Sequence, residues 1–387
     1  MKIVNIYERE IVLPSPVRNS YFSQNAGGVI VLITDAIRHG KPVIGYGFNS
    51  IVHYTPTSTL RDRVIPRLLN ANPEEYIDER NSNLDAEKIF KIVTKNEKTS
   101  GHGELAHAVG AIDMAVWDTI AKIEGVPLYK VLADRYNNGV YDTNVSTYAA
   151  GGYYYPGKGI DVLQNEMKAY LDQGFTRVKL KIGGAGLEED LRRIEAVIKV
   201  VGTGSKVAVD ANARFDLQTA LKYGEVMEPY SLMWFEEPGN PLDYQLNATL
   251  CENYRGPIST GENLFSLQDA ENIIRYGGLR ADRDNLQFDV QLSYGIVGYL
   301  KILEMMRLHG WSPKRCDPHG GNLYCLHVAA GLQLGGSECY PGVFQPFGGF
   351  ADGIPIVEGC VKLTDAPGIG FETKNNLYRF LRQAIGE

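Results

Sequence analysis

The chain has 387 residues, 44% of them hydrophobic and 22% charged, which suits a globular protein with one large domain and one smaller domain. Its formal net charge of −7 argues against nucleic acid or an anionic membrane as the main partner, but local lysines and a bound cation could still attract a small anion. The five cysteines form no CxxC pair, residues 1–14 have no apolar core of signal-peptide type, and the sequence has no long uncharged apolar run. We therefore expect reduced thiols, a cytoplasmic location and no membrane partner.

The first third of the chain predicts a small sheet followed by helices. Three apolar stretches separated by Pro and Gly favour strands, at residues 2–11, 28–37 and 42–50. Helical periodicity follows at residues 57–69, 85–96 and 103–125. Strands first and helices after indicate a separate α+β domain, which we assign to residues 1–140.

From residue 141 the pattern changes to a repeat of strand and helix. The eight predicted strands cover residues 144–150, 176–182, 206–211, 231–237, 257–260, 285–289, 312–316 and a short piece around Glu338. Amphipathic segments separate them, which favours a parallel α/β barrel, a (β/α)8-type TIM barrel, over an open sheet. We assign this barrel to residues 141–355 and expect residues 356–387 to form a tail that packs on the first domain.

Charged residues recur at the ends of the predicted barrel strands. In the strand at residues 176–182, Lys179 and Lys181 share one face because side chains alternate along a strand. Later strands bring further charged groups at intervals of about one βα unit, namely Asp210, Glu236, Glu262, Asp289 and His319. All of them should therefore meet at one mouth of the barrel, where such folds carry their active sites.

Three of these acids predict a metal site. Asp210, Glu236 and Glu262 offer hard oxygen ligands with no soft ligand nearby, which suits Mg²⁺, or Mn²⁺ as an alternative, and does not suit zinc. Any one of them alone could be an ordinary acid at a strand end or helix cap, but all three at even spacing favour a ligand set. Glu237 could exchange roles with Glu236, although strand alternation should turn only one of the two inward.

The two lysines suggest a general base. Lys181 can accept a proton only as a neutral amine, and we expect Lys179, a bound cation and partial burial to lower the pKa of Lys181. Two lysines on one strand face are otherwise typical of a solvated surface.

His319 with Asp289 resembles an imidazole whose orientation is fixed by a carboxylate. The alternative is that His319 is a plain turn residue of the sequence PHGG. Asn212 should share the inner face with Asp210, or it could cap the following helix.

Six motifs follow one another along the chain, namely KLK, VDAN, FEEP, TGEN, the strand end at Asp289 and PHGG. These motifs, in this order, resemble those of the enolase superfamily, in its mandelate-racemase-like branch. Loop strings over nearly the whole chain resemble most closely those of the D-tartrate dehydratases of this branch, namely SPVRNSY, GYGFNS, NEK followed by GHGE, AAGGYYYPGKG, GENLFS and FQPFGGF. The resemblance implies a (β/α)7β barrel under an α+β capping domain that the C-terminal tail closes.

The resemblance also implies roles for individual residues. It implies Mg²⁺ on Asp210, Glu236 and Glu262. Lys181 would be the base, Lys179 its neighbour near the substrate carboxylate, and His319 the general acid paired with Asp289. The implied substrate contacts are Asn212, Glu338 on the last strand, and, at the distal end of the substrate, Asn19, Lys98 and Tyr155.

The expected function is the Mg²⁺-dependent dehydration of an acid sugar to a 2-keto acid, most specifically of D-tartrate to oxaloacetate. Alternatives are a dehydratase of a longer aldonate or aldarate, a racemase or epimerase of a 2-hydroxy acid, and a non-catalytic homologue that binds a ligand in a regulatory role. The complete set of base, acid and metal ligands argues against the last, because binding alone requires no poised acid and base. We also expect a homo-oligomer.

Overall fold

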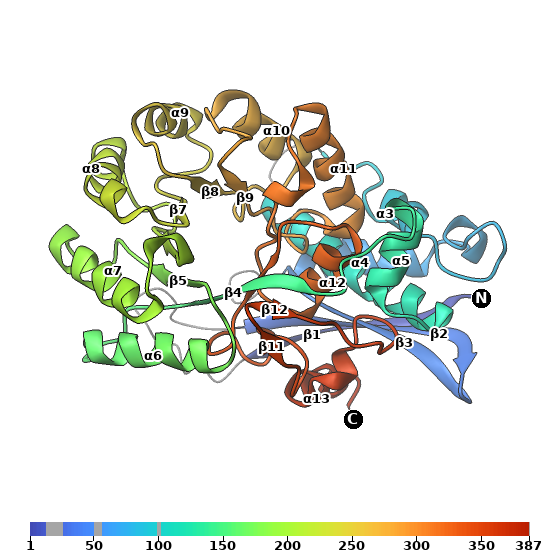
Figure 1. Cartoon of the computed structure of the whole chain (residues 1–387). Coiled ribbons are helices and arrows are strands. Elements are labelled where there is room, and N and C mark those ends of the chain that lie inside the picture. Colours follow the sequence, from blue (N-terminus) through green and yellow to red (C-terminus); the bar gives the residue numbers. More distant parts are fainter. Residues whose placement is uncertain (13–25, 50–55, 99–101, 387) are drawn as a thin grey trace.

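The structure, a computed structural model, describes residues 1–12, 26–49, 56–98 and 102–386. Figure 1 shows a barrel flanked by helices α6 to α11, with a small sheet and helices α3 to α5 on its other side. Within the described residues, no helix has the length and hydropathy needed to span a membrane.

The N-terminal unit is an antiparallel sheet covered by helices, as predicted. Its strands are β1 (Ile3–Val12), β2 (Ala26–Arg38) and β3 (Lys41–Phe48), in the order β1-β2-β3. A helical run follows as α1 (Thr57–Thr59), a π turn (Leu60–Val64) and α2 (Ile65–Leu69), and then come α3 (Ala86–Val93), α4 (His102–Glu124) and α5 (Leu128–Tyr136).

Helix α4 lies directly on β3 because β3 contains two glycines at the contact. A Cβ atom on Gly45 would lie 2.2 Å from the carbonyl oxygen of Ala115, and one on Gly47 would lie 2.3 Å from that of Ala111. Any side chain at these positions would force the helix off the sheet.

The barrel strands follow one another in parallel order. They are β4 (Val145–Gly151), β5 (Val178–Lys181), β6 (Val207–Asp210), β7 (Trp234–Glu236), β8 (Ile258–Thr260), β9 (Asn285–Leu286) and β10 (Ser337–Cys339). Between β9 and β10 the predicted strand at residues 312–316 is only a single bridge from Leu286 to Cys316, because Pro313 begins a 3-10 turn there. Strand β10 pairs with β4 and closes the ring.

Seven helices of the described chain alternate with these eight strand positions. They are α6 (Ile160–Asp172), α7 (Leu187–Val201), α8 (Leu217–Met227), α9 (Tyr244–Asn253), α10 (Leu267–Tyr276), α11 (Gly295–Leu308) and α12 (Leu323–Gly331). The arrangement is a (β/α)7β barrel, and the predicted fold class is confirmed.

The last part of the chain touches both units. The hairpin β11 (Ile356–Val357) and β12 (Cys360–Val361) adds to β4 of the barrel, and α13 (Asn375–Gln383) lies beside the N-terminal sheet (Figure 1). Between them, the amide of Ile369 donates a 2.7 Å hydrogen bond to Asp118 of α4. The division of the chain at residues 140 and 355 stays a prediction.

Helix α4 carries two buried acids that join it to the rest of the molecule. Asp118 accepts a second amide hydrogen bond from Tyr46 at 2.9 Å, and it pairs with Lys122 at 2.7 Å. Asp113 accepts a 2.6 Å hydrogen bond from the amide of Ile296 in the first turn of α11. Because the backbone donors are fixed, these acids hold the capping unit, the barrel and the C-terminal segment together.

Candidate active site

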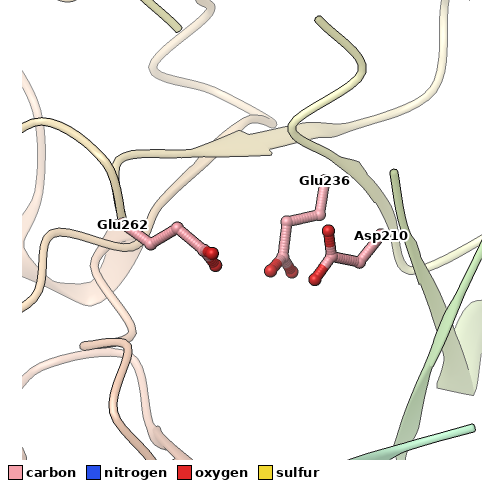
Figure 2. A group of neighbouring side chains, drawn as sticks. All are labelled: Asp210, Glu236 and Glu262. Carbon is pink, nitrogen blue, oxygen red and sulfur yellow. The ribbon is translucent and has the colours of Figure 1, made fainter. Parts of the chain in front are cut away.

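The backbone register brings three of the predicted site residues to one level at the barrel mouth. Lys181, Asp210 and Glu236 are the last residues of β5, β6 and β7, and Asp210 pairs with each of the other two. Glu262 follows β8 by two residues. Figure 2 shows the carboxylates of Asp210, Glu236 and Glu262 pointing toward one another.

These three carboxylates fit a hard divalent cation. One oxygen of each lies within 4.8 Å of the others. Asp210 and Glu236 are fully buried, and the buried Oε2 of Glu262 has no hydrogen-bond partner among the described residues. An oxygen left in this state costs free energy unless something else binds it. Mg²⁺ or Mn²⁺ matches the all-oxygen set, as predicted.

Glu236 is held in place by neighbours that the sequence analysis did not identify. Its Oε2 accepts hydrogen bonds from Nε1 of Trp234 at 2.8 Å and from Nε2 of Gln287 at 3.0 Å. The signal was present in the predicted strands, because Trp234 and Gln287 stand two residues before Glu236 and Asp289, and alternate residues of a strand share a face. Hydrogen bonds of this kind fix the orientation of a metal ligand.

Both lysines are buried against the acids. The Lys181 amine pairs with Asp210, and Lys179 pairs with Glu236 and, at 2.7 Å, with Glu338 on β10. Burial alone would lower the pKa of Lys181, but the Asp210 carboxylate outweighs it and the pKa is raised. The expectation of a lowered pKa is therefore wrong for the protein's own groups, because the Asp210 carboxylate raises the pKa by more than burial and Lys179 lower it.

His319 is oriented as predicted. Its Nδ1 lies 2.7 Å from Oδ2 of Asp289, whose Oδ1 accepts the amides of Gln291 and Leu292. Burial would lower the pKa of His319, but the charges of Glu262 and Asp289 raise it to about 10. The imidazole is therefore protonated at neutral pH and can donate a proton from Nε2, which faces Glu262 Oε2 at 3.8 Å.

Two side chains near the triad differ from the simplest expectation. The backbone amide of Asn212 donates to Oδ1 of Asp210 at 2.8 Å, and α8 is capped by Asp216, so the capping alternative for Asn212 is wrong. Glu237 is buried and bound by Nδ2 of Asn263 at 2.7 Å, so it does not turn outward as strand alternation predicted. The strand ends at Glu236, and the positive φ of 36° at Glu237 breaks the alternation.

The remaining predicted substrate contacts have different surroundings. Glu338 is buried and accepts the amide of Gly320 at 3.3 Å. Tyr155 is half-buried and lies under the Lys158 amine, 4.6 Å from the ring centre. Lys98 is exposed and lines a cleft with Phe90, Leu267 and Lys301, which the triad does not line. Asn19 lies outside the described residues.

Comparisons with known proteins agree with this geometry. A family model described as Enolase C-terminal domain-like matches residues 162–377. The chain is 30% identical to L-talarate/galactarate dehydratase of Salmonella typhimurium over 76% of this chain and 71% of the relative. It is 29% identical to arabinonate dehydratase of Saccharolobus solfataricus over 87% and 84%.

A solved structure extends the likeness over almost the whole chain. It is L-talarate dehydratase from Polaromonas sp. JS666, complexed with Mg and L-glucarate. The TM-score is 0.75 at 26% identity, and the match covers 95% of this chain and 94% of the other.

Proposed function

Because the chain belongs to the enolase superfamily, in the branch of mandelate racemase and muconate lactonizing enzyme, we propose that it dehydrates a sugar acid with Mg²⁺, and that D-tartrate is the substrate and oxaloacetate the product. The placement of a base and an acid at the two ends of the metal triad carries this proposal. Lys181 is bound to Asp210 and His319 faces Glu262, with Glu236 between the two acids (Figure 2).

The chemistry begins next to a carboxylate. When bound, Mg²⁺ withdraws electron density from the substrate carboxylate and makes the neighbouring C2 proton more acidic. Lys181, as a neutral amine, accepts this proton through its lone pair. Its partner Asp210 would also hold the cation, and a bound positive charge would weaken the pairing of Asp210 with Lys181 and lower the pKa of the lysine.

The negative charge that develops on the substrate carboxylate is balanced by the buried ammonium of Lys179. His319 then donates its Nε2 proton to the 3-hydroxyl as the C3–O bond breaks, and the oxygen leaves as water with the bonding electrons. The enol that remains becomes the 2-keto acid. Further substrate contacts stay predictions for Asn212, Glu338, Lys98, Asn19 and Tyr155.

The named relatives favour a second candidate substrate class. They are dehydratases of talarate, galactarate and arabinonate, which are longer than tartrate. The same base and acid would serve a longer acid, and the choice between the two depends on the groups around the distal end of the substrate.

The test is the formation of 2-keto acid by purified protein with Mg²⁺, across the tartrate stereoisomers, galactarate, talarate, arabinonate and other C4 to C6 sugar acids. We expect turnover of D-tartrate. Turnover of longer acids alone would replace the substrate and keep the chemistry. Racemisation or epimerisation without loss of water would show a racemase, and absence of any turnover with metal bound would favour a binding protein.

Two further proposals concern the state of the protein. All five cysteines are free, which supports a reducing, cytoplasmic location. We also propose a homo-oligomer, which light scattering of the purified protein would test.

A further inference from the structure

Tyr340, which the sequence analysis did not identify, lies against the reactive nitrogen of His319. Its hydroxyl is 3.1 Å from Nε2 of His319. Nδ1 of the same ring is bound to Asp289, so Nε2 is the nitrogen left to act on a substrate. The carboxylate oxygens nearest to Nε2, on Glu262 and Glu338, are farther away, at 3.8 and 3.9 Å.

The ring of Tyr340 has little freedom to leave this position. It is 2% exposed and packs on the turn that follows His319, where a Cβ atom on Gly321 would lie 2.3 Å from the ring. Phe344 meets it edge-on, with ring centres 4.9 Å apart. Burial raises the pKa of the Tyr340 phenol well above its ordinary value, so the hydroxyl keeps its proton and can donate it in a hydrogen bond.

A group that takes a proton from His319 must lie within hydrogen-bond distance of Nε2. Because the Tyr340 hydroxyl lies 3.1 Å from the same nitrogen, a group that approaches Nε2 on that side of the ring would also meet the hydroxyl. We propose that Tyr340 donates a hydrogen bond to the departing hydroxyl of the substrate, so that it selects acids carrying a hydroxyl at C3. This inference rests on the proposed dehydration.

The proton balance of the reaction is unchanged by this role. His319 supplies the proton that makes water, the C3–O electron pair goes to the oxygen, and Tyr340 keeps its own proton while it stabilises the charge on that oxygen. A fixed donor of this kind acts mainly when the charge develops.

The experiment compares Tyr340→Phe with Tyr299→Phe, which removes another buried hydroxyl, bonded to Cys316 at 3.0 Å. With Mg²⁺ and D-tartrate, we expect Tyr340→Phe to lose at least tenfold in 2-keto acid formation. Exchange of the C2 proton with D2O, which depends on Lys181, should change less than threefold. Tyr299→Phe should resemble the wild type in both assays.

A second measurement uses binding to the Lys181→Ala protein, with and without Tyr340→Phe, in the presence of Mg²⁺. The ligands are D-tartrate and the malate enantiomer that keeps the C2 configuration but lacks the second hydroxyl. We expect Tyr340→Phe to weaken tartrate binding and leave malate binding unchanged, because only tartrate offers the contact.

The outcomes separate the two proposals. If the wild type forms no 2-keto acid from any acid, the dehydration is wrong, and the tartrate–malate comparison still decides the contact. If the wild type dehydrates and Tyr340→Phe keeps its rate and its tartrate–malate preference, the role of Tyr340 is overturned. An equal loss of dehydration and C2 exchange would also overturn it, since it would indicate a general disturbance of the mouth.

Discussion

Two buried charged networks in this protein differ in how fully their acids are satisfied. In the capping unit, Asp118 accepts the amides of Tyr46 and Ile369 and pairs with Lys122. At the barrel mouth, the acids are held mainly by side chains, and Oε2 of Glu262 has no hydrogen-bond partner in the part of the chain that the structure describes.

This difference separates stability from function. Backbone amides are fixed donors, so the Asp118 network is complete without any ligand and stabilises the fold. The barrel mouth has more carboxylates than lysines, and one carboxylate oxygen has no hydrogen-bond partner among the described residues. Both features raise the free energy of the empty site and so favour the binding of a cation and a substrate. Substitutions at the mouth should therefore change activity, and those in the capping network should change stability.

The largest expected effect is the loss of chemistry at the mouth. His319→Asn should lower dehydration by about 10²- to 10⁴-fold, the usual contribution of an acid or base, while exchange of the C2 proton with D2O continues. Lys181→Met should abolish both, because the proton is never removed. NMR of the substrate in D2O measures exchange and product together. Dehydration at the wild-type rate by His319→Asn would refute its role as the acid, and exposed Lys199→Met serves as the control.

Breaking the capping network should cost stability. Asp118→Ala leaves two buried amides without their acceptor and removes one of the two acids that pair with Lys122, the other being Glu372. We expect this to lower the free energy of unfolding by about 3–5 kcal/mol. Activity per folded molecule should stay unchanged. Urea unfolding measures the effect, and Asp365→Ala, whose side chain is 81% exposed, should change stability by less than about 1 kcal/mol. Equal effects of the two substitutions would contradict the comparison.

A smaller effect concerns Asp113, whose pKa burial raises to about 7. The folded protein then holds a proton between pH 4 and 7 that the unfolded chain releases, so this acid lowers stability as the pH rises through that range, by up to about 1.4 kcal/mol per pH unit. Asp113→Asn keeps an acceptor for the Ile296 amide and should flatten this slope. Unfolding at several pH values compares the two proteins, and identical slopes would exclude the effect.

The last effect is the stabilisation of the fold by the metal ion. Mg²⁺ at about 100 times its dissociation constant should stabilise the protein by about 2.7 kcal/mol, because it binds only the folded site. The midpoint of thermal unfolding should rise by a few degrees, and Glu262→Gln should remove most of this rise. A metal-dependent rise that survives in Glu262→Gln would mean that the cation binds elsewhere.

The features of the site that could be predicted from the sequence are those that depend on regular spacing along the chain. Spacing of one βα unit placed Asp210, Glu236 and Glu262 at one mouth, and strand alternation placed Lys179 below Lys181. The prediction of Glu237 failed where the strand stops, because one backbone angle moves its side chain. Tyr340 was missed because its contact with His319 depends on how two loops pack together, and no local sequence pattern predicts that packing.

The hydrogen bond from Ile369 to Asp118 joins residues 251 positions apart. During synthesis at about 5–20 residues per second, Asp118 would wait roughly 10–50 s before this donor exists. Helix α4 must pass that time with a buried acid incompletely satisfied, at a stage when the barrel is still being made. The capping unit is therefore synthesised first, but its last hydrogen bond forms only after the C-terminal segment has been made. During this interval, we expect this part of the nascent chain to be the most dependent on chaperones and the most prone to aggregate.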